Sequence, residues 1–150
     1  MIKRPPSCSP EREKLYLSLG SNLGDRAQNL RRAIALIEER VGAVQRVSSF
    51  IETEPWGFES EHPFLNAACL VLTTLSPIEC LEATQQIERE LGRKKKSKNG
   101  KYHDRPIDID LLMYGDQTIS TPRLTIPHPR MQERDFVMIP LREILPSTER

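Results

Sequence analysis

Two aspartates stand inside an otherwise apolar run from Arg105 to Gly115, which reads RPIDIDLLMYG. The alternation of side-chain types along this run as far as Tyr114 predicts a β-strand, and the glycine ends it. Successive side chains of a strand point to opposite faces, so Asp108 and Asp110 lie on the same face. The second half of the run is apolar on both faces, which indicates a strand covered on both sides. We therefore expect this strand at the centre of a sheet.

Aspartate is depleted in strands, so a pair of them points to a chemical role. The Cα atoms of Asp108 and Asp110 lie about 6.6 Å apart in an extended strand. Two carboxylates at that distance repel by roughly 2–3 kcal/mol at an effective dielectric constant near 20. A divalent cation removes this repulsion, and Mg²⁺ suits carboxylates that leave positions open for water and substrate phosphates. The alternative is a solvated strand end with two surface acids, because a D-x-D pair alone is a common pattern.

A cationic segment precedes this strand. Residues 93–105 read RKKKSKNGKYHDR and hold seven Lys or Arg residues against one acid, a charge of +6 in a chain whose net charge is +1. Cationic side chains and a metal together neutralise the oxygens of a polyphosphate, so the combination predicts such a substrate. The glycine and asparagine of the segment suit a lid that closes over it. A solvated loop or a nucleic-acid patch is the alternative for a lysine run.

Length and composition limit the organisation of the chain. The 150 residues predict a single domain over residues 15–150, after a flexible leader over residues 1–14 that lacks the hydrophobic stretch of a secretory signal. No apolar run reaches the length of a transmembrane helix. Cys8, Cys69 and Cys80 are odd in number and widely spaced, which indicates free thiols in the reducing cytoplasm. A net charge near zero argues against a surface that binds nucleic acid or an anionic membrane as a whole.

Periodicity and capping signals order the elements. Asp25 marks the start of one helix, and Ser76 with Glu79 forms a capping box at the start of another. The order β-α-β-β-α-β predicts an α+β, ferredoxin-like fold, an antiparallel sheet with helices on one face, here with a C-terminal extension. The expected strands are 15–19, 44–53, 64–74, 105–115 and 118–119, the expected helices are 25–41, 76–91 and 134–145, the last broken at Pro140, and residues 123–130 are extended.

Seven motifs, taken together and in order, are far more specific than any one of them. They are LGSNLGD at 19–25, SSFIETEPWG at 48–57, PFLNAA at 63–68, IERELGR at 87–93, DRPIDIDLLMYG at 104–115, LTIPHPRM at 124–131 and RDFVMIPL at 134–141. By these motifs the chain closely resembles the 6-hydroxymethyl-7,8-dihydropterin pyrophosphokinase family of folate biosynthesis. The resemblance implies an ATP-dependent diphosphotransferase that uses two Mg²⁺ ions. It moves the pyrophosphoryl group of ATP to the hydroxymethyl group of the pterin, by attack at the β-phosphorus, and releases AMP.

We expect a cytoplasmic monomer without nucleic-acid or membrane partners. The resemblance also implies roles for residues. Asp108 and Asp110 match ligands of the two Mg²⁺ ions, and Arg93 and Arg105 match arginines that act on the phosphates. The remaining nucleotide positions are Glu88, Lys95, Tyr102, Leu111, Arg123, Thr125, His128 and Arg134. The pterin positions are Thr53, Glu54, Trp56, Phe64, Asn66 and Phe136, where the two phenylalanines stack on the ring and the amide binds its edge. No side chain stands out as a general base, so we expect catalysis to be mainly positional and electrostatic.

Two other functions fit parts of the sequence. A nucleotidyltransferase also pairs a D-x-D motif with phosphates, but it releases pyrophosphate where a pyrophosphokinase releases AMP. A non-enzymatic RNA-binding module shares the β-α-β-β-α-β order. We disfavour the RNA-binding module because the strands lack the paired surface aromatics on which bases stack.

Overall fold

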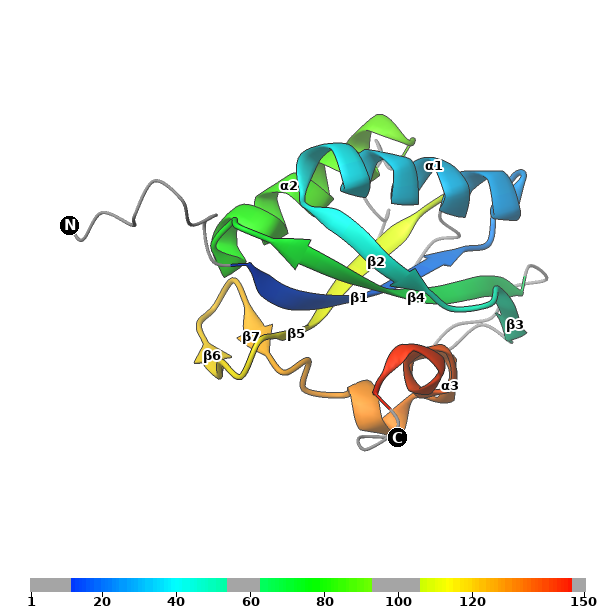
Figure 1. Ribbon diagram of the computed structural model, residues 1–150. Helices are drawn as coiled ribbons and strands as arrows, with labels where there is room; N and C mark the ends of the chain where they lie inside the picture. Colours follow the sequence, from blue (N-terminus) through cyan, green and yellow to red (C-terminus); the bar gives the residue numbers. More distant parts are fainter. Residues whose placement is uncertain (1–11, 54–62, 93–105, 147–150) are drawn as a thin grey trace.

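A computed structural model describes residues 12–53, 63–92 and 106–146 of the chain. In these residues an antiparallel sheet carries helices on both of its faces (Figure 1). The strands are β1 (Glu13–Ser21), β2 (Ala43–Val47), β3 (Ile51–Thr53), β4 (Phe64–Thr73) and β5 (Asp108–Tyr114), with a small hairpin of β6 (Ile119–Ser120) and β7 (Thr125–Ile126). The helices are α1 (Arg26–Arg40), α2 (Pro77–Glu90) and α3 (Asp135–Ile144), and a 3-10 turn, Met131–Glu133, precedes α3.

The main sheet has the strand order β2-β4-β1-β5, and β3 also pairs with β4. Among the described strands β5 pairs only with β1, so the prediction of a central position for the aspartate strand is wrong. Its second half is apolar on both faces because it is covered from above and below. Leu111 packs in the core with α1 and α2, and Leu112 packs in the core with α3. A strand is apolar on both faces when other layers pack on both sides of its sheet. It does not also need a neighbouring strand on each edge.

A register shift interrupts the ladder between β1 and β5. Leu17 of β1 pairs with Leu111, and the next pair along the ladder skips Leu112, as in a β-bulge. Beyond the bulge, Tyr114 belongs to the core under α1 and α2. Strict alternation, which would place Tyr114 on the face of Asp110, is therefore wrong for the end of this strand.

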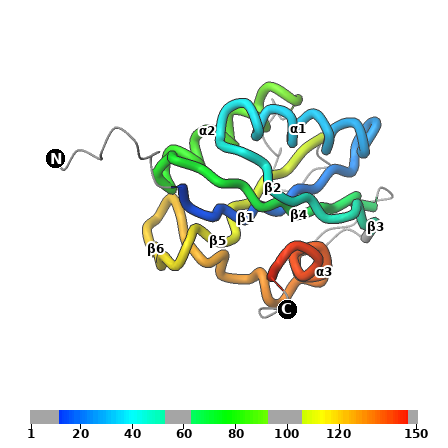
Figure 2. Tube along the Cα trace, viewed as in Figure 1, coloured from blue at the N-terminus to red at the C-terminus, as the bar shows by residue number. Residues whose placement is uncertain are grey.

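Helices α1 and α2 lie on one face of the sheet, and α3 lies on the other (Figure 2). Helix α3 is thus a third layer, and the prediction of helices on one face only is wrong. Helix α3 also continues through Pro140, which is buried, and the predicted break there is wrong. Proline removes one helical hydrogen bond, but the apolar face made by Val137, Leu141 and Ile144 keeps the helix on the sheet.

Local signals place the helix starts correctly. The side chain of Asp25 accepts a hydrogen bond of 3.1 Å from the backbone N–H of Gln28 at the start of α1. At the start of α2, Ser76 Oγ accepts from the N–H of Glu79 at 3.2 Å, and Glu79 Oε1 accepts from the N–H of Ser76 at 2.8 Å. The expected strand 44–53 is divided into β2 and β3, a division that these local signals did not show.

The described cysteines are free and buried, as predicted for Cys69 and Cys80. Burial raises the pKa of Cys69 to about 12 and that of Cys80 to about 11. Both thiols therefore stay protonated and unreactive at neutral pH. Cys8 lies outside the described residues. Across the described part of the chain, no helix is both long enough and apolar enough to span a membrane.

Candidate functional site

Asp108 and Asp110 share one face of β5, as the alternation predicts. They pair with Gly20 and Ser18 of β1, and both are half-buried, whereas Ile109 between them is buried beneath α1 and α2. The two carboxylates therefore lie on the side of the sheet that carries α3. Half-buried carboxylates on one face fit Mg²⁺, which keeps several waters and completes its shell with phosphate oxygens. Three or more His, Cys, Asp or Glu side chains do not cluster anywhere in the described part of the chain.

A cavity of about 270 Å³ lies beside Asp110. The residues that line it include Asp110 and Leu111 of β5, and Arg123, Thr125 and His128 from the segment around β7. The family resemblance assigns all five to metal or nucleotide, although they come from two separate parts of the chain. Arg123 is an exposed cation that also pairs with Glu82 of α2 at 3.4 Å. The cavity thus offers a carboxylate, a guanidinium, an imidazole and a hydroxyl in one place.

His128 is held by its own backbone and by a neighbour. The backbone N–H of His128 donates to the carbonyl of Leu112 of β5 at 2.9 Å. The ring atom Nδ1 accepts from the backbone N–H of Arg130 at 3.3 Å. Burial lowers the pKa of His128, the charge of Arg134 lowers it further, and the charge of Asp108 opposes them. The ring is therefore neutral at pH 7, and because Nδ1 is an acceptor, its proton is on Nε2. It can donate one hydrogen bond from that atom.

Glu88 lies under the aspartate strand. It is a buried residue of α2, and its Oε2 accepts a hydrogen bond of 2.7 Å from the backbone N–H of Ile109. The family resemblance assigns Glu88 to the nucleotide. The structure directs this carboxylate oxygen to the backbone that separates Asp108 from Asp110.

Two of the expected pterin residues meet at the start of β4. Asn66 is buried, and its Nδ2 donates to the carbonyl of Ile51 at 3.3 Å. A Cβ atom added to Gly20 of β1 would lie 3.1 Å from Asn66 Oδ1 and 3.2 Å from Phe64 Cδ1. The missing side chain at Gly20 therefore lets both residues lie close to the backbone of β1.

Phe136 comes from the other layer of the fold. It lies in α3, which packs against β4, and the guanidinium carbon of Arg134 is 5.6 Å from the centroid of its ring. Thr53 is the last residue of β3 and pairs with Phe64. Six assigned residues lie outside the described parts of the chain: Glu54, Trp56, Arg93, Lys95, Tyr102 and Arg105.

Sequence reasoning missed a link at the start of α1. Arg26 donates from Nη1 to the carbonyl of Pro63 at 2.9 Å, and its Nη2 is 2.7 Å from Glu52 Oε2. It joins the two chain ends that flank residues 54–62, and it lines a cavity of about 400 Å³ together with Asn22 and Gly24. An ion pair across 26 positions leaves no local pattern that could have shown it.

Comparison with known proteins identifies the family of this chain. The family model for 7,8-dihydro-6-hydroxymethylpterin-pyrophosphokinase matches residues 16–146. A 2-amino-4-hydroxy-6-hydroxymethyldihydropteridine pyrophosphokinase of Porphyromonas gingivalis is 53% identical over 133 residues, covering 88% of this chain and 90% of the relative. The Bacillus subtilis protein of the same name is 46% identical over 136 residues, covering 90% of this chain and 80% of the relative.

A solved structure shows the same fold. The HPPK-DHPS protein of Plasmodium falciparum superimposes with a TM-score of 0.74 at 17% identity, and the match covers 93% of this chain but only 43% of that one. The fold and these relatives define an enzyme of the pyrophosphoryl-transferring class. The chain belongs to the 7,8-dihydro-6-hydroxymethylpterin-pyrophosphokinase family, whose reaction serves folate synthesis.

Proposed function

We propose that this protein transfers the pyrophosphoryl group of ATP to the hydroxymethyl group of 6-hydroxymethyl-7,8-dihydropterin and releases AMP. The observation that carries the proposal is the position of Asp108 and Asp110, on one face of β5 beside the cavity that Asp110 shares with Arg123 and His128. Carboxylates, a guanidinium and a neutral imidazole at one cavity suit a metal-bound polyphosphate. The family membership of the chain agrees with this chemistry.

The nucleotide binds in the 270 Å³ cavity. Arg123 contacts phosphate or ribose oxygens as a cation, and His128 donates from Nε2 to an acceptor of the nucleotide. Thr125 offers a hydroxyl, and Leu111 an apolar wall beside the base. The remaining contacts come from Arg134 and Glu88 and from residues 93–105. In that segment Arg93 and Arg105 act on the phosphates, and Lys95 and Tyr102 contact the nucleotide.

Asp108 and Asp110 hold two Mg²⁺ ions in this proposal. When bound, the ions neutralise phosphate oxygens and withdraw electron density from the β-phosphorus. The chain itself keeps the carboxylates in place through the pairing of β5 with β1 and through the bond from Ile109 to Glu88. The cations of residues 93–105 balance the charge that develops on the departing α-phosphate oxygen.

The pterin binds on the α3 side of β4. Asn66 meets the polar edge of the ring, since an amide both donates and accepts. Phe64 and Phe136 stack on its two faces, and Thr53, Glu54 and Trp56 border it. The hydroxymethyl oxygen attacks the β-phosphorus, the bond from that phosphorus to the α-phosphate oxygen breaks, AMP leaves with the electron pair, and the hydroxyl proton passes to solvent.

We further propose that the sheet and helices α1 and α2 form a ferredoxin-like unit, with α3 as its extension. The strand order β2-β4-β1-β5 and the antiparallel pairing support this assignment. We also propose that the enzyme acts as a monomer in the cytoplasm, where buried thiols such as Cys69 stay reduced.

The test is a product assay. The protein is incubated with ATP, MgCl₂ and 6-hydroxymethyl-7,8-dihydropterin, and the products are separated by chromatography. We expect AMP and the pterin diphosphate in equal amounts, and neither when the pterin is omitted. Release of pyrophosphate with a nucleotidylated pterin would instead identify a nucleotidyltransferase, and release of ADP a simple kinase.

A further inference from the structure

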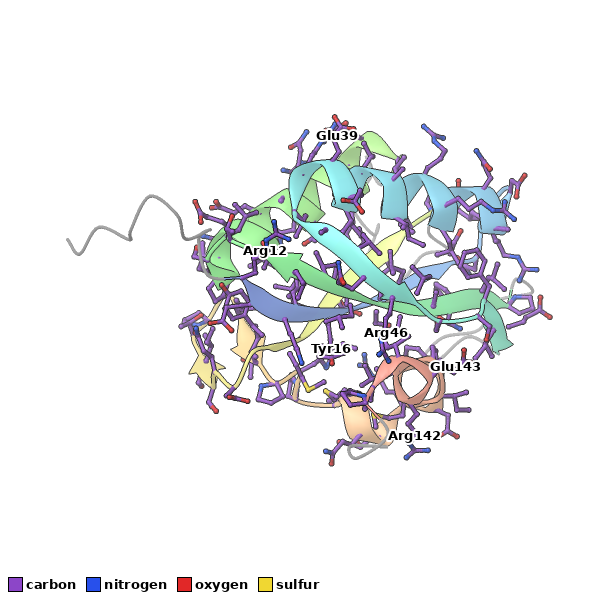
Figure 3. All side chains as sticks on the ribbon, viewed as in Figure 1. Arg12, Tyr16, Glu39, Arg46, Arg142 and Glu143 are labelled. Atoms are coloured by element: carbon purple, nitrogen blue, oxygen red, sulfur yellow. The ribbon has the colours of Figure 1, made fainter. Side chains whose placement is uncertain are left out.

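The carboxylate of Glu143 joins helix α3 to the connection between β2 and β3 through hydrogen bonds. Glu143 accepts hydrogen bonds from both donors of Ser49, its backbone N–H and its hydroxyl. The backbone N–H and Oγ of Ser49 each donate to Oε1 at 2.9 Å, and Oγ also approaches Oε2 at 2.7 Å. These bonds lower the pKa of Glu143, so the carboxylate is charged at neutral pH. Figure 3 shows Glu143 on the side of α3 near the sheet and Arg142 on the side away from it.

The same connection is tied to β4. The N–H of Ser48 donates to the carbonyl of Ala68 at 2.9 Å, and the N–H of Ala68 donates to Ser48 Oγ at 2.8 Å. Arg46 of β2 adds a bond from Nη1 to the carbonyl of Ile144 at 3.4 Å, and it points toward α3 in Figure 3. Two consecutive serines therefore join the end of α3 to the middle of β4.

Both ends of this link belong to elements that carry expected pterin residues. Phe136 precedes Glu143 by seven positions, two helical turns, so both lie on one face of α3. Asn66 precedes Ala68 by two positions, so both lie on one face of β4. The separation of α3 from β4 at the link therefore influences the separation of Phe136 from the start of β4.

We propose that Glu143 is a positioning residue that sets the width of the pterin slot between α3 and β4. The proposal depends on the proposed function, which places the pterin between Phe64 and Phe136. A flat ring needs both stacking faces at a defined separation, so a helix that is free to shift weakens the ring contacts first. The nucleotide cavity is lined by β5, by the segment around β7 and by Leu81 of α2, and none of its lining residues belongs to α3 or to residues 46–49. Arg134, a proposed nucleotide contact, caps the opposite end of α3 from Glu143.

If Glu143 only stabilises the fold, its loss should have a different effect on the kinetics. Loss of the link would then lower the melting temperature and the fraction of active enzyme. The KM for each substrate would stay the same, because the molecules that remain folded would have an unchanged slot. The ratio of the two KM values separates these possibilities.

The experiment measures the KM for the pterin and the KM for ATP in Glu143→Ala, Glu143→Gln and Ser49→Ala. In Glu143→Ala we expect the pterin KM to rise about fivefold, which corresponds to about 1 kcal/mol, while the ATP KM stays constant. Glu143→Gln is expected to recover part of the effect, since its amide oxygen still accepts from the N–H of Ser49. The matched control is Arg142→Ala, at the exposed position immediately before Glu143 in α3. It should leave the KM for the pterin and the KM for ATP unchanged.

A Phe136→Ala variant separates this proposal from the function on which it depends. If Phe136→Ala raises the pterin KM and Glu143→Ala does not, the positioning role is refuted and the pterin site stands. An equal rise of both KM values in Glu143→Ala also refutes it. If Phe136→Ala leaves the pterin KM unchanged, the proposed pterin site fails and the positioning role fails with it. Ser49→Ala keeps the test decisive if Glu143→Ala does not fold.

Discussion

The carboxylate of Glu88 accepts a 2.7 Å hydrogen bond from the backbone N–H of Ile109, the residue between Asp108 and Asp110. Among the described strands β5 has a partner on one side only, and an edge strand presents N–H groups that no neighbouring strand satisfies. A buried helix carboxylate satisfies this one. The spacing of the two aspartates is therefore held from both sides of the strand, by β1 and by α2.

Removing the carboxylate of Glu88 should disturb both stability and turnover. In Glu88→Ala we expect a loss of about 1–3 kcal/mol in the free energy of unfolding, because a buried N–H is left without this acceptor. We also expect a lower kcat, because the backbone between the aspartates can move. Glu88→Gln keeps an acceptor for this N–H, so it should retain more stability and a higher kcat than Glu88→Ala. Urea denaturation and steady-state kinetics measure the two effects.

The control for this prediction is Glu90 on the same helix. It is an exposed residue that pairs with Arg40, and surface pairs contribute little to stability. Glu90→Ala should therefore leave kcat unchanged. Equal turnover in Glu88→Ala and in the wild-type protein would contradict the supporting role of Glu88.

Asp110→Asn should abolish most of the turnover without unfolding the protein. We expect kcat to fall at least about a hundredfold, the scale seen when one electrostatic group is removed from an active site. The melting temperature without Mg²⁺ should be equal or slightly higher, because one of two neighbouring like charges is lost. Asp116→Asn, an exposed acid just beyond the same strand, is the control. Near-normal turnover in Asp110→Asn would rule out a metal-binding role for this carboxylate.

Gly42→Ala should destabilise the protein without changing substrate binding. A Cβ atom at this position would lie 2.2 Å from the carbonyl oxygen of Leu72, so the backbones of β2 and β4 would have to separate. We expect a loss of about 1–3 kcal/mol, as for other overpacked sites, measured by thermal denaturation. Gly20→Ala is the contrasting variant. Its added methyl meets the side chains of Asn66 and Phe64, so it should raise the pterin KM instead.

The link between Ser49 and Glu143 predicts a dependence of stability on pH. Hydrogen bonds from the Ser49 backbone and side chain lower the pKa of Glu143 below its ordinary value of 4.5. A carboxyl whose folded pKa is lowered stabilises the fold above its unfolded pKa, and this contribution disappears as the pH falls through the folded pKa. The difference in unfolding free energy between the wild type and Glu143→Gln should therefore be constant near neutral pH and shrink below pH 4.5. A difference that grows on acidification would contradict this assignment.

Part of the fold follows from neighbouring residues alone. The caps at Asp25 and Ser76 each depend on a partner three positions away. The common face of Asp108 and Asp110 depends only on the period of a strand. Such features are fixed by the local geometry of the backbone, so the sequence alone was sufficient to predict them. Its seven motifs were sufficient to predict the family.

The tertiary structure decided the features that depend on which segments meet. Among the described strands β5 pairs only with β1, which places it at the edge of the sheet, and the apolar second half of the strand could not show this position. Glu88 and Ile109 are 21 positions apart, and Ser49 and Glu143 are 94 apart. No periodicity connects residues at such separations, because their contact exists only after sheet and helices have packed. The sequence by itself therefore determined the carboxylates and the strand that carries them, and the packing of α2 and α3 decided what holds those groups in place.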